Sequence, residues 1–134
     1  MSPAVELRDF LAAEGVGTVA ATSGWSLSAT LEPAGPDTVI TLYDTPGPAP
    51  VSYAIELRQQ GVQVRVRAPA NDYAGAYAKQ VEAFRALNSI TNQVIGQGFY
   101  LGVRLVGDIQ SLGRDDNDRH LLVANYQIQR GPAP

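Results

Sequence analysis

Apolar and polar side chains alternate most cleanly in the segment GVQVRVRA, residues 61–68. One face carries Val62, Val64 and Val66, and the other carries Gln63, Arg65 and Arg67. A period of two residues is that of a β-strand with one buried face. The pattern therefore predicts a half-buried strand, with Arg65 and Arg67 on its solvent or subunit face.

Glycines and prolines divide the preceding stretch, residues 15–50, into short runs rich in strand-forming residues. Such spacing favours strands near 25–31 and 38–43, joined by the turn EPAGPD (32–37). The segment TPGPAP (45–50) then reads as an extended loop, because its prolines and glycine break helices.

Two longer strands are predicted in the C-terminal part of the chain, at 99–105 and about 120–129, where alternation resumes. In the last strand Leu122, Ala124, Tyr126 and Ile128 fall on one face. The stretch 53–60 is ambiguous between a short strand and a helical turn.

Two helices are predicted from caps and periodicity. Ser2 followed by Pro3 is typical of a helix start, and Gly15 of a stop, which predicts a helix over 3–14. Asn71 or Asp72 caps a second helix that ends near Asn88. Its predicted buried face follows the helical spacing of Tyr73, Tyr77, Val81, Phe84 and Leu87, with Lys79, Glu82 and Arg85 on the outer side.

The order helix, strands, helix, strands contains no repeated βαβ unit. It predicts an α+β fold: an antiparallel or mixed β-sheet with two helices packed on one face, ending in a terminal β-hairpin. The 134 residues fit a single domain, 1–134. The final residues RGPAP (130–134) are expected to be a frayed tail.

Composition narrows the class of protein. Apolar residues make up 45% of the chain and charged residues 17%, so a packed globule with a weakly charged surface, suited to meeting other subunits, is expected. The net charge of −3 argues against a general nucleic-acid binder. Lys79 is the only lysine, which leaves no polybasic face for a membrane.

Cysteine is absent, which removes disulfides, thiolate metal sites and cysteine nucleophiles. The sequence shows no apolar run as long as a membrane span, and MSPAVELRDF has no signal-peptide core. We therefore expect a protein made and kept in the cytoplasm.

The segment LGRDDNDRH, residues 112–120, holds three aspartates and invites a metal-binding interpretation. Counted from Asp115, an EF-hand loop needs glycine at the sixth position and glutamate at the twelfth, and here these are His120 and Tyr126. Asp and Asn are also the residues that tight turns prefer. The cluster is predicted to be a turn between strands.

Other motifs that are typical of enzymes are incomplete or lack the structural context that they require. GVGTVA (15–20) has the glycine spacing of a dinucleotide loop, but a helix precedes it and strands follow, the reverse of what that loop requires. His120 is the only histidine and no G-x-S-x-G occurs, so an acyl-transfer site is not indicated. A carboxylate pair assembled only by folding stays open. The residues alone thus predict a soluble α+β domain without metal or cofactor.

Two segments carry a family resemblance. VQVRVRAPANDYAGAYAKQVEAFRALN (62–88) and LGRDDNDRHLLVANYQIQR (112–130) resemble the tail terminator and minor capsid proteins of long-tailed bacteriophages. In that family an arginine-ending strand leads through a short loop into a helix of the Y…A…A…AL kind. A final hairpin then carries an LGRD…R…NY…R pattern. ITLYDTPG (40–47) is also similar to the family's early strand and loop.

The resemblance implies a structural, non-enzymatic role in the virion neck. Such proteins form a homohexameric ring on the end of the tail tube, stop its polymerisation and present a surface for head joining. The implied partners are further copies of the chain, the major tail tube protein and a head completion or connector protein. DNA only passes through the ring, and no membrane or cofactor is involved.

Exposed polar groups then become candidates for subunit or tube contacts. These interface candidates are Arg65, Arg67, Arg114, Asp115, Asp116, Asn117, Asp118 and Arg119. Charge reversal at Asp115 and Asp116 is expected to impair assembly without unfolding the domain. Three alternatives stand beside this interpretation: a head completion or stopper protein, a small hydrolase with spatially assembled carboxylates, and a ligand-binding module with a pocket between sheet and helices.

Overall fold

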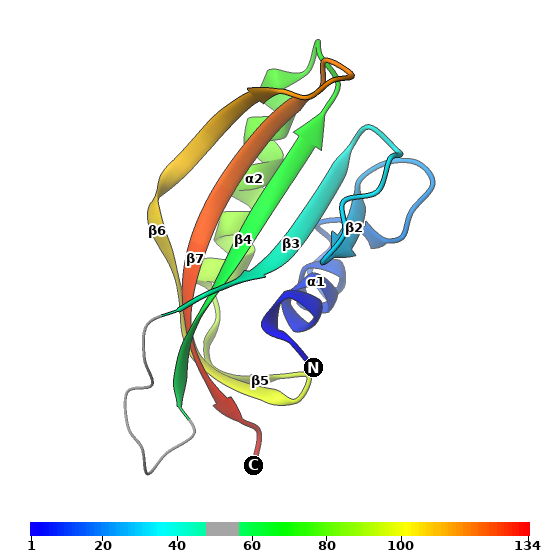
Figure 1. Cartoon of the computed structure of the whole chain (residues 1–134). Helices are drawn as coiled ribbons and strands as arrows, with labels where there is room; N and C mark the ends of the chain where they lie inside the picture. Colours follow the sequence, from blue (N-terminus) through cyan, green and yellow to red (C-terminus); the bar gives the residue numbers. More distant parts are fainter. Residues whose placement is uncertain (48–56) are drawn as a thin grey trace.

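The structure, a computed structural model, describes residues 1–47 and 57–134. Predictions for 48–56, which take in part of the loop 45–50 and part of the ambiguous stretch 53–60, lie outside the described residues. Figure 1 shows two helices, α1 (Pro3–Ala13) and α2 (Tyr73–Asn88), and a curled sheet. The strands are β1 (Thr18–Val19), β2 (Ser26–Ala29), β3 (Val39–Thr45), β4 (Arg58–Ala68), β5 (Thr91–Ile95), β6 (Gly98–Arg114) and β7 (His120–Pro132).

Within the described residues the strands form one seven-stranded sheet in the order β1-β2-β3-β4-β7-β6-β5. β1, β2 and β3 pair in parallel, and all the other neighbours are antiparallel. The prediction of an α+β fold with a mixed sheet is confirmed. β7, the last strand of the chain, lies in the interior of the sheet between β4 and β6 (Figure 1).

α1 begins where the sequence predicts, because its free amide groups find acceptors. Ser2 is the N-cap, and its hydroxyl accepts a hydrogen bond from the Val5 amide at 3.5 Å. The Asp44 carboxylate of β3 accepts a second one from the Ala4 amide at 2.9 Å. The first turn of a helix leaves such amides unpaired, so the two acceptors stabilise the helix start and join it to the sheet.

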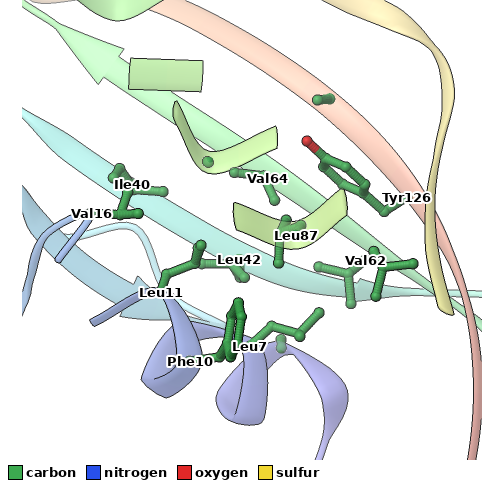
Figure 2. Close-up of a cluster of buried hydrophobic side chains, with 14 of the residues drawn as sticks. Leu7, Phe10, Leu11, Val16, Ile40, Leu42, Val62, Val64, Leu87 and Tyr126 are labelled. Carbon is green, nitrogen blue, oxygen red and sulfur yellow. The ribbon is translucent and has the colours of Figure 1, made fainter. Parts of the chain in front are cut away.

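Side chains from both helices and from the sheet share one hydrophobic core. Figure 2 shows Leu7, Phe10 and Leu11 of α1 together with Leu42, Val62, Val64, Leu87 and Tyr126. The alternating valines of β4 are fully buried, as the sequence pattern predicts. β5, which the pattern does not predict, pairs with the start of β6 through a turn that contains Gly96 at a φ of +59°.

The predicted buried face of α2 is right at Leu87 and Phe84 but wrong at Tyr73 and Tyr77. Its buried residues are Ala76, Gln80, Ala83 and Leu87, whereas Tyr73 and Tyr77 are 46% and 45% exposed. Small side chains let the helix approach the sheet closely. The buried Gln80 amide donates to the backbone carbonyls of Val64 at 3.1 Å and Leu122 at 3.3 Å, which belong to β4 and β7.

Lys79 is likewise not on the outer side of the helix. Its ammonium donates to the Val16 carbonyl at 2.9 Å and lies 5.3 Å from the centre of the Trp25 ring. Lys79 therefore links α2 to the segment that follows α1, and its long aliphatic stem covers apolar surface on the way.

The C-terminal segment 130–134, for which a frayed tail is predicted from sequence, pairs with the sheet over part of its length. Gly131 and Pro132 pair with Phe99 and Gly98 of β6, and the Ala133 amide donates to the Gln97 carbonyl at 3.0 Å. Polar contacts formed only on folding thus hold the segment to the sheet as far as Ala133.

A buried polar cluster anchors the same end of the chain. The Glu6 carboxylate of α1 is 1% exposed and accepts hydrogen bonds from Arg130 at 2.8 Å, Tyr100 at 2.7 Å and the Gln97 amide at 2.6 Å. Arg130 also donates to the Met1 carbonyl at 2.9 Å. Burial, followed by the hydrogen bond to Glu6, raises the pKa of Tyr100 far above its usual range. The cluster joins α1, the β5–β6 turn and β7.

Candidate functional site

The turn between β6 and β7 is built around the carboxylate of Asp115. One oxygen accepts from the amides of Asn117 at 3.0 Å and Arg119 at 2.8 Å, and the other accepts from the Arg119 guanidinium at 2.8 Å. The Asp118 amide donates to the Asp115 carbonyl at 2.9 Å, with Asp118 itself at a φ of +63°. Aspartate tolerates that backbone conformation better than most residues. The interpretation of this cluster as a turn is confirmed.

These contacts set the charge state of Asp115. Burial raises the pKa of its carboxyl, but the hydrogen bonds and the positive charge of Arg119 outweigh burial, so the pKa lies below its usual value of 3.8. The carboxylate is ionised at neutral pH and is committed to contacts inside the turn.

Arg119 and Arg67 hold the 32–37 loop against this end of the sheet. Arg119 donates to the Ala34 carbonyl at 2.8 Å, and its side chain is 11% exposed. Arg67 donates to the carbonyls of Pro33 at 2.7 Å, Pro36 at 2.6 Å and Asp37 at 3.3 Å. Burial, and then the nearby charge of Arg119, lowers the pKa of Arg67.

The prediction that Arg67 lies on an exposed face is therefore wrong, because Arg67 is 2% exposed. Strand periodicity placed it correctly on the face opposite Val66, but the 32–37 loop folds over that end of the face. Arg67 supports the loop from beneath.

Four other interface candidates are exposed at the β6–β7 turn: Arg114, Asp116, Asn117 and Asp118. Arg114 pairs with Asp118 at 3.1 Å, with 50% and 65% of their side chains exposed. Asp116 lies at the tip, and no ion pair involving it is found among the described residues. The turn thus presents a net negative tip, although Asp115 beside it faces inward.

The sheet face opposite the buried valines of β4 carries amides and two arginines. We call this surface the amide–arginine face and define it by Gln59, Gln63 and Arg65 of β4, Arg104 of β6, and Asn125, Gln127 and Gln129 of β7. Arg104 donates to the Gln127 amide oxygen at 2.5 Å, and Gln127 donates to Gln59 at 3.0 Å, so the hydrogen bonds cross three strands. Gln63 donates to Asn125 at 3.2 Å.

Arg65 lies at one end of this face, opposite Val123 of β7. Its guanidinium carbon is 5.9 Å from the centre of the Tyr43 ring, and its Nε atom is buried without a hydrogen-bond partner. A shallow depression of about 460 Å³ at the opposite end of the face is lined by Gln59, Gly102, Val103, Arg104, Gln127 and Gln129. Sequence analysis found Arg65 but missed Arg104 and the amides, although the polar positions of β7 were visible in its alternation.

The described residues offer little for catalysis. No group of three histidine or carboxylate side chains that could hold a metal ion occurs in 1–47 and 57–134. The His120 ring contacts the Ala70 carbonyl at 2.8 Å and the edge of the Tyr73 ring. Among these same residues, no helix has both the length and the apolar character needed to cross a membrane.

Comparison with known proteins gives a consistent picture. The comparison with curated proteins finds no match. Among solved structures the fold is similar to a chain from the virion of a native gene transfer agent particle, with a TM-score of 0.59, 16% identity and 78% of each chain covered. The sequence model of the family described as bacteriophage tail terminator protein matches residues 10–130. This match confirms the resemblance first seen in the motifs at 62–88 and 112–130. The chain belongs to the bacteriophage tail terminator family and is a structural protein of the phage virion, located in its tail and neck region.

Proposed function

We propose that this protein forms a homohexameric ring that caps the tail tube, stops its polymerisation and provides the surface for head joining. The observation that carries the proposal is the family match, which spans nearly the whole chain from residue 10 to residue 130. The partners are further copies of the chain, the major tail tube protein and a head completion or connector protein, with DNA passing through the lumen. The role is structural, not enzymatic.

The exposed edge of β6 supports a role in assembly. β5 pairs with β6 only as far as Gly102, and in the described part of the chain the outer edge of β6 beyond that point has no partner strand. Val106 and Leu112 on this stretch are 50% and 49% exposed. Unpaired strand edges bind other chains readily, so an edge of this length fits a protein that works inside an assembly.

An amber mutation in the gene, in the phage that encodes it, tests the proposal. Electron microscopy of the lysate is expected to show overlong tails that are not attached to filled heads. A plasmid copy of the wild-type gene is the matched control and should restore normal tails.

Other outcomes of this experiment would support a different function. Tails of normal length that remain separate from heads would assign the protein to head completion instead. Normal infectious particles would contradict a virion-assembly role altogether and would reopen the search for a ligand or substrate.

A further inference from the structure

The amide–arginine face contrasts in charge with the rest of the molecule. The chain has 13 acidic and 10 basic residues, yet the seven residues that define the face include two arginines and no carboxylate. Three acidic residues at its covered end, Glu32, Asp37 and Asp115, act on Arg67 and lie in the 32–37 loop or in the β6–β7 turn. The open part of the face is therefore positive on a chain that is negative as a whole.

In the part of the chain that the structure describes, the two arginines of this face have no anionic partner. In the described residues neither Arg65 nor Arg104 takes part in an ion pair, whereas Arg114, Arg119 and Arg130 each do. Arg65 rests on Tyr43 and keeps a buried Nε atom without an acceptor. Arginine held against an aromatic ring loses little entropy on binding, and such residues are frequent anchors of protein interfaces.

A complementary charge is presented by the same chain at another place. The tip of the β6–β7 turn exposes Asp116, Asn117 and Asp118. No contact between this tip and Arg65 or Arg104 occurs in the described structure of one chain. The tip of one copy can therefore meet the face only on another copy.

We propose that the β6–β7 tip of one copy docks on the amide–arginine face of the next, with Asp116 against Arg65. The contact joins two different patches, so it is head-to-tail and can repeat around a closed ring. The amides supply donors and acceptors that need no charge partner. This inference rests on the proposed ring and names the surfaces that build it.

Charge reversal in complemented phage tests the contact. Cells carrying plasmid-borne variants are infected with the amber phage, and infectious particles are counted. Arg65→Glu and Asp116→Arg are each expected to lower the titre at least tenfold, because each places like charges together. The double variant Arg65→Glu/Asp116→Arg restores the pair with its signs exchanged and is expected to recover most of the titre. Tyr77→Glu, on the exposed face of α2, is the matched control and should change it little.

Cross-linking gives a second, direct readout. The chain has no cysteine, so Arg65→Cys/Asp116→Cys places two unique thiols on it. A short bis-maleimide reagent applied to purified particles is expected to give a ladder of covalent oligomers, and the pair Tyr77→Cys/Asp116→Cys is expected to give none.

Several results would overturn the contact. They are normal titres for both single variants, a double variant no better than the singles, or equal cross-linking of the control pair. A loss of titre confined to Arg65→Glu would mean that the face binds DNA or the tube protein and not the tip of another copy. If the amber phage makes overlong tails while these variants behave as wild type, only the contact is wrong. Normal tails in the amber phage would contradict the ring function itself.

Discussion

Two adjacent aspartates at the β6–β7 turn have opposite surroundings. Asp115 accepts three hydrogen bonds within the turn, whereas Asp116 points outward. The sequence offers no way to tell them apart, since both suit a turn equally well. Charge reversal at Asp115 would therefore disturb the turn itself, and only Asp116 can report on assembly without that complication.

Substitution by alanine should change the stability of the protein by different amounts at the two positions. Asp115→Ala leaves two amides and the Arg119 side chain without their acceptor, and we expect it to lower the free energy of unfolding by about 1–3 kcal/mol. Asp116→Ala is expected to change it by less than about 0.5 kcal/mol. Urea denaturation of both variants at pH 7 measures the difference. Equal values would show that the carboxylate of Asp115 does not hold the turn.

The lowered pKa of Asp115 predicts how this contribution depends on pH. A carboxyl whose pKa is lower in the folded than in the unfolded state stabilises the fold above its unfolded pKa, near 3.8, and loses that effect as the pH falls through its folded pKa. The stability gap between wild type and Asp115→Asn is thus expected to be largest near neutral pH and to shrink below about pH 3.8. Denaturation curves at several pH values would reveal a constant gap if ionisation were irrelevant.

At the scale of elements, α2 buries small side chains in its first turns, where the sequence pattern predicts that two tyrosines are buried. Ala76, Gln80 and Ala83 face the sheet, while Tyr73 and Tyr77 are exposed. The side-chain pattern favours the tyrosine face, because apolar periodicity measures hydrophobicity and not the space available. Close packing of the helix on β4 and β7 requires small residues, and the Gln80 amide satisfies carbonyls that an apolar residue could not.

The two faces of α2 should respond differently to a change in side-chain size. Ala83→Leu adds volume where the helix lies on the sheet, and we expect a loss of about 1–3 kcal/mol in the free energy of unfolding. Tyr77→Ala removes a large ring from an exposed position and is expected to cost less than about 1 kcal/mol. Thermal denaturation followed by circular dichroism distinguishes them, and the reverse ranking would support the orientation predicted from sequence.

Most of the strand and helix positions could be read from local patterns. The structure contains the Ser2 cap, the alternating buried valines of β4 and the alternation of β7. Each of these features depends only on residues that are neighbours in sequence. β5 was missed because its residues Thr91 to Val94 are exposed and show no alternation. No local pattern could predict three other features: the covering of Arg67, the role of Arg104 and the pairing of Glu6 with Arg130. Each of them depends on contacts between segments that are far apart in the chain.

For the whole molecule, the Glu6–Arg130 pair joins side chains that are 124 positions apart in the sequence. Removing only the arginine strands a buried carboxylate, so Arg130→Met is expected to lower the free energy of unfolding by about 3–5 kcal/mol. The double variant Glu6→Gln/Arg130→Met keeps an acceptor for Tyr100 and removes both charges, and it should be more stable than the single variant. Urea denaturation at pH 7 tests both. A small effect of Arg130→Met would mean that water solvates Glu6.

The position of β7 bears on the order in which the protein is made. The strands before it leave the ribosome as two groups, β1 to β4 and β5 to β6, and β7 is the strand that later joins them. Arg65 lies on β4 and Arg104 on β6, so the surface between them exists only after β7 has inserted. A chain released before residue 120 would carry both arginines without a continuous face to hold them. Incomplete translation products would then be unable to compete with finished subunits for a place in the particle.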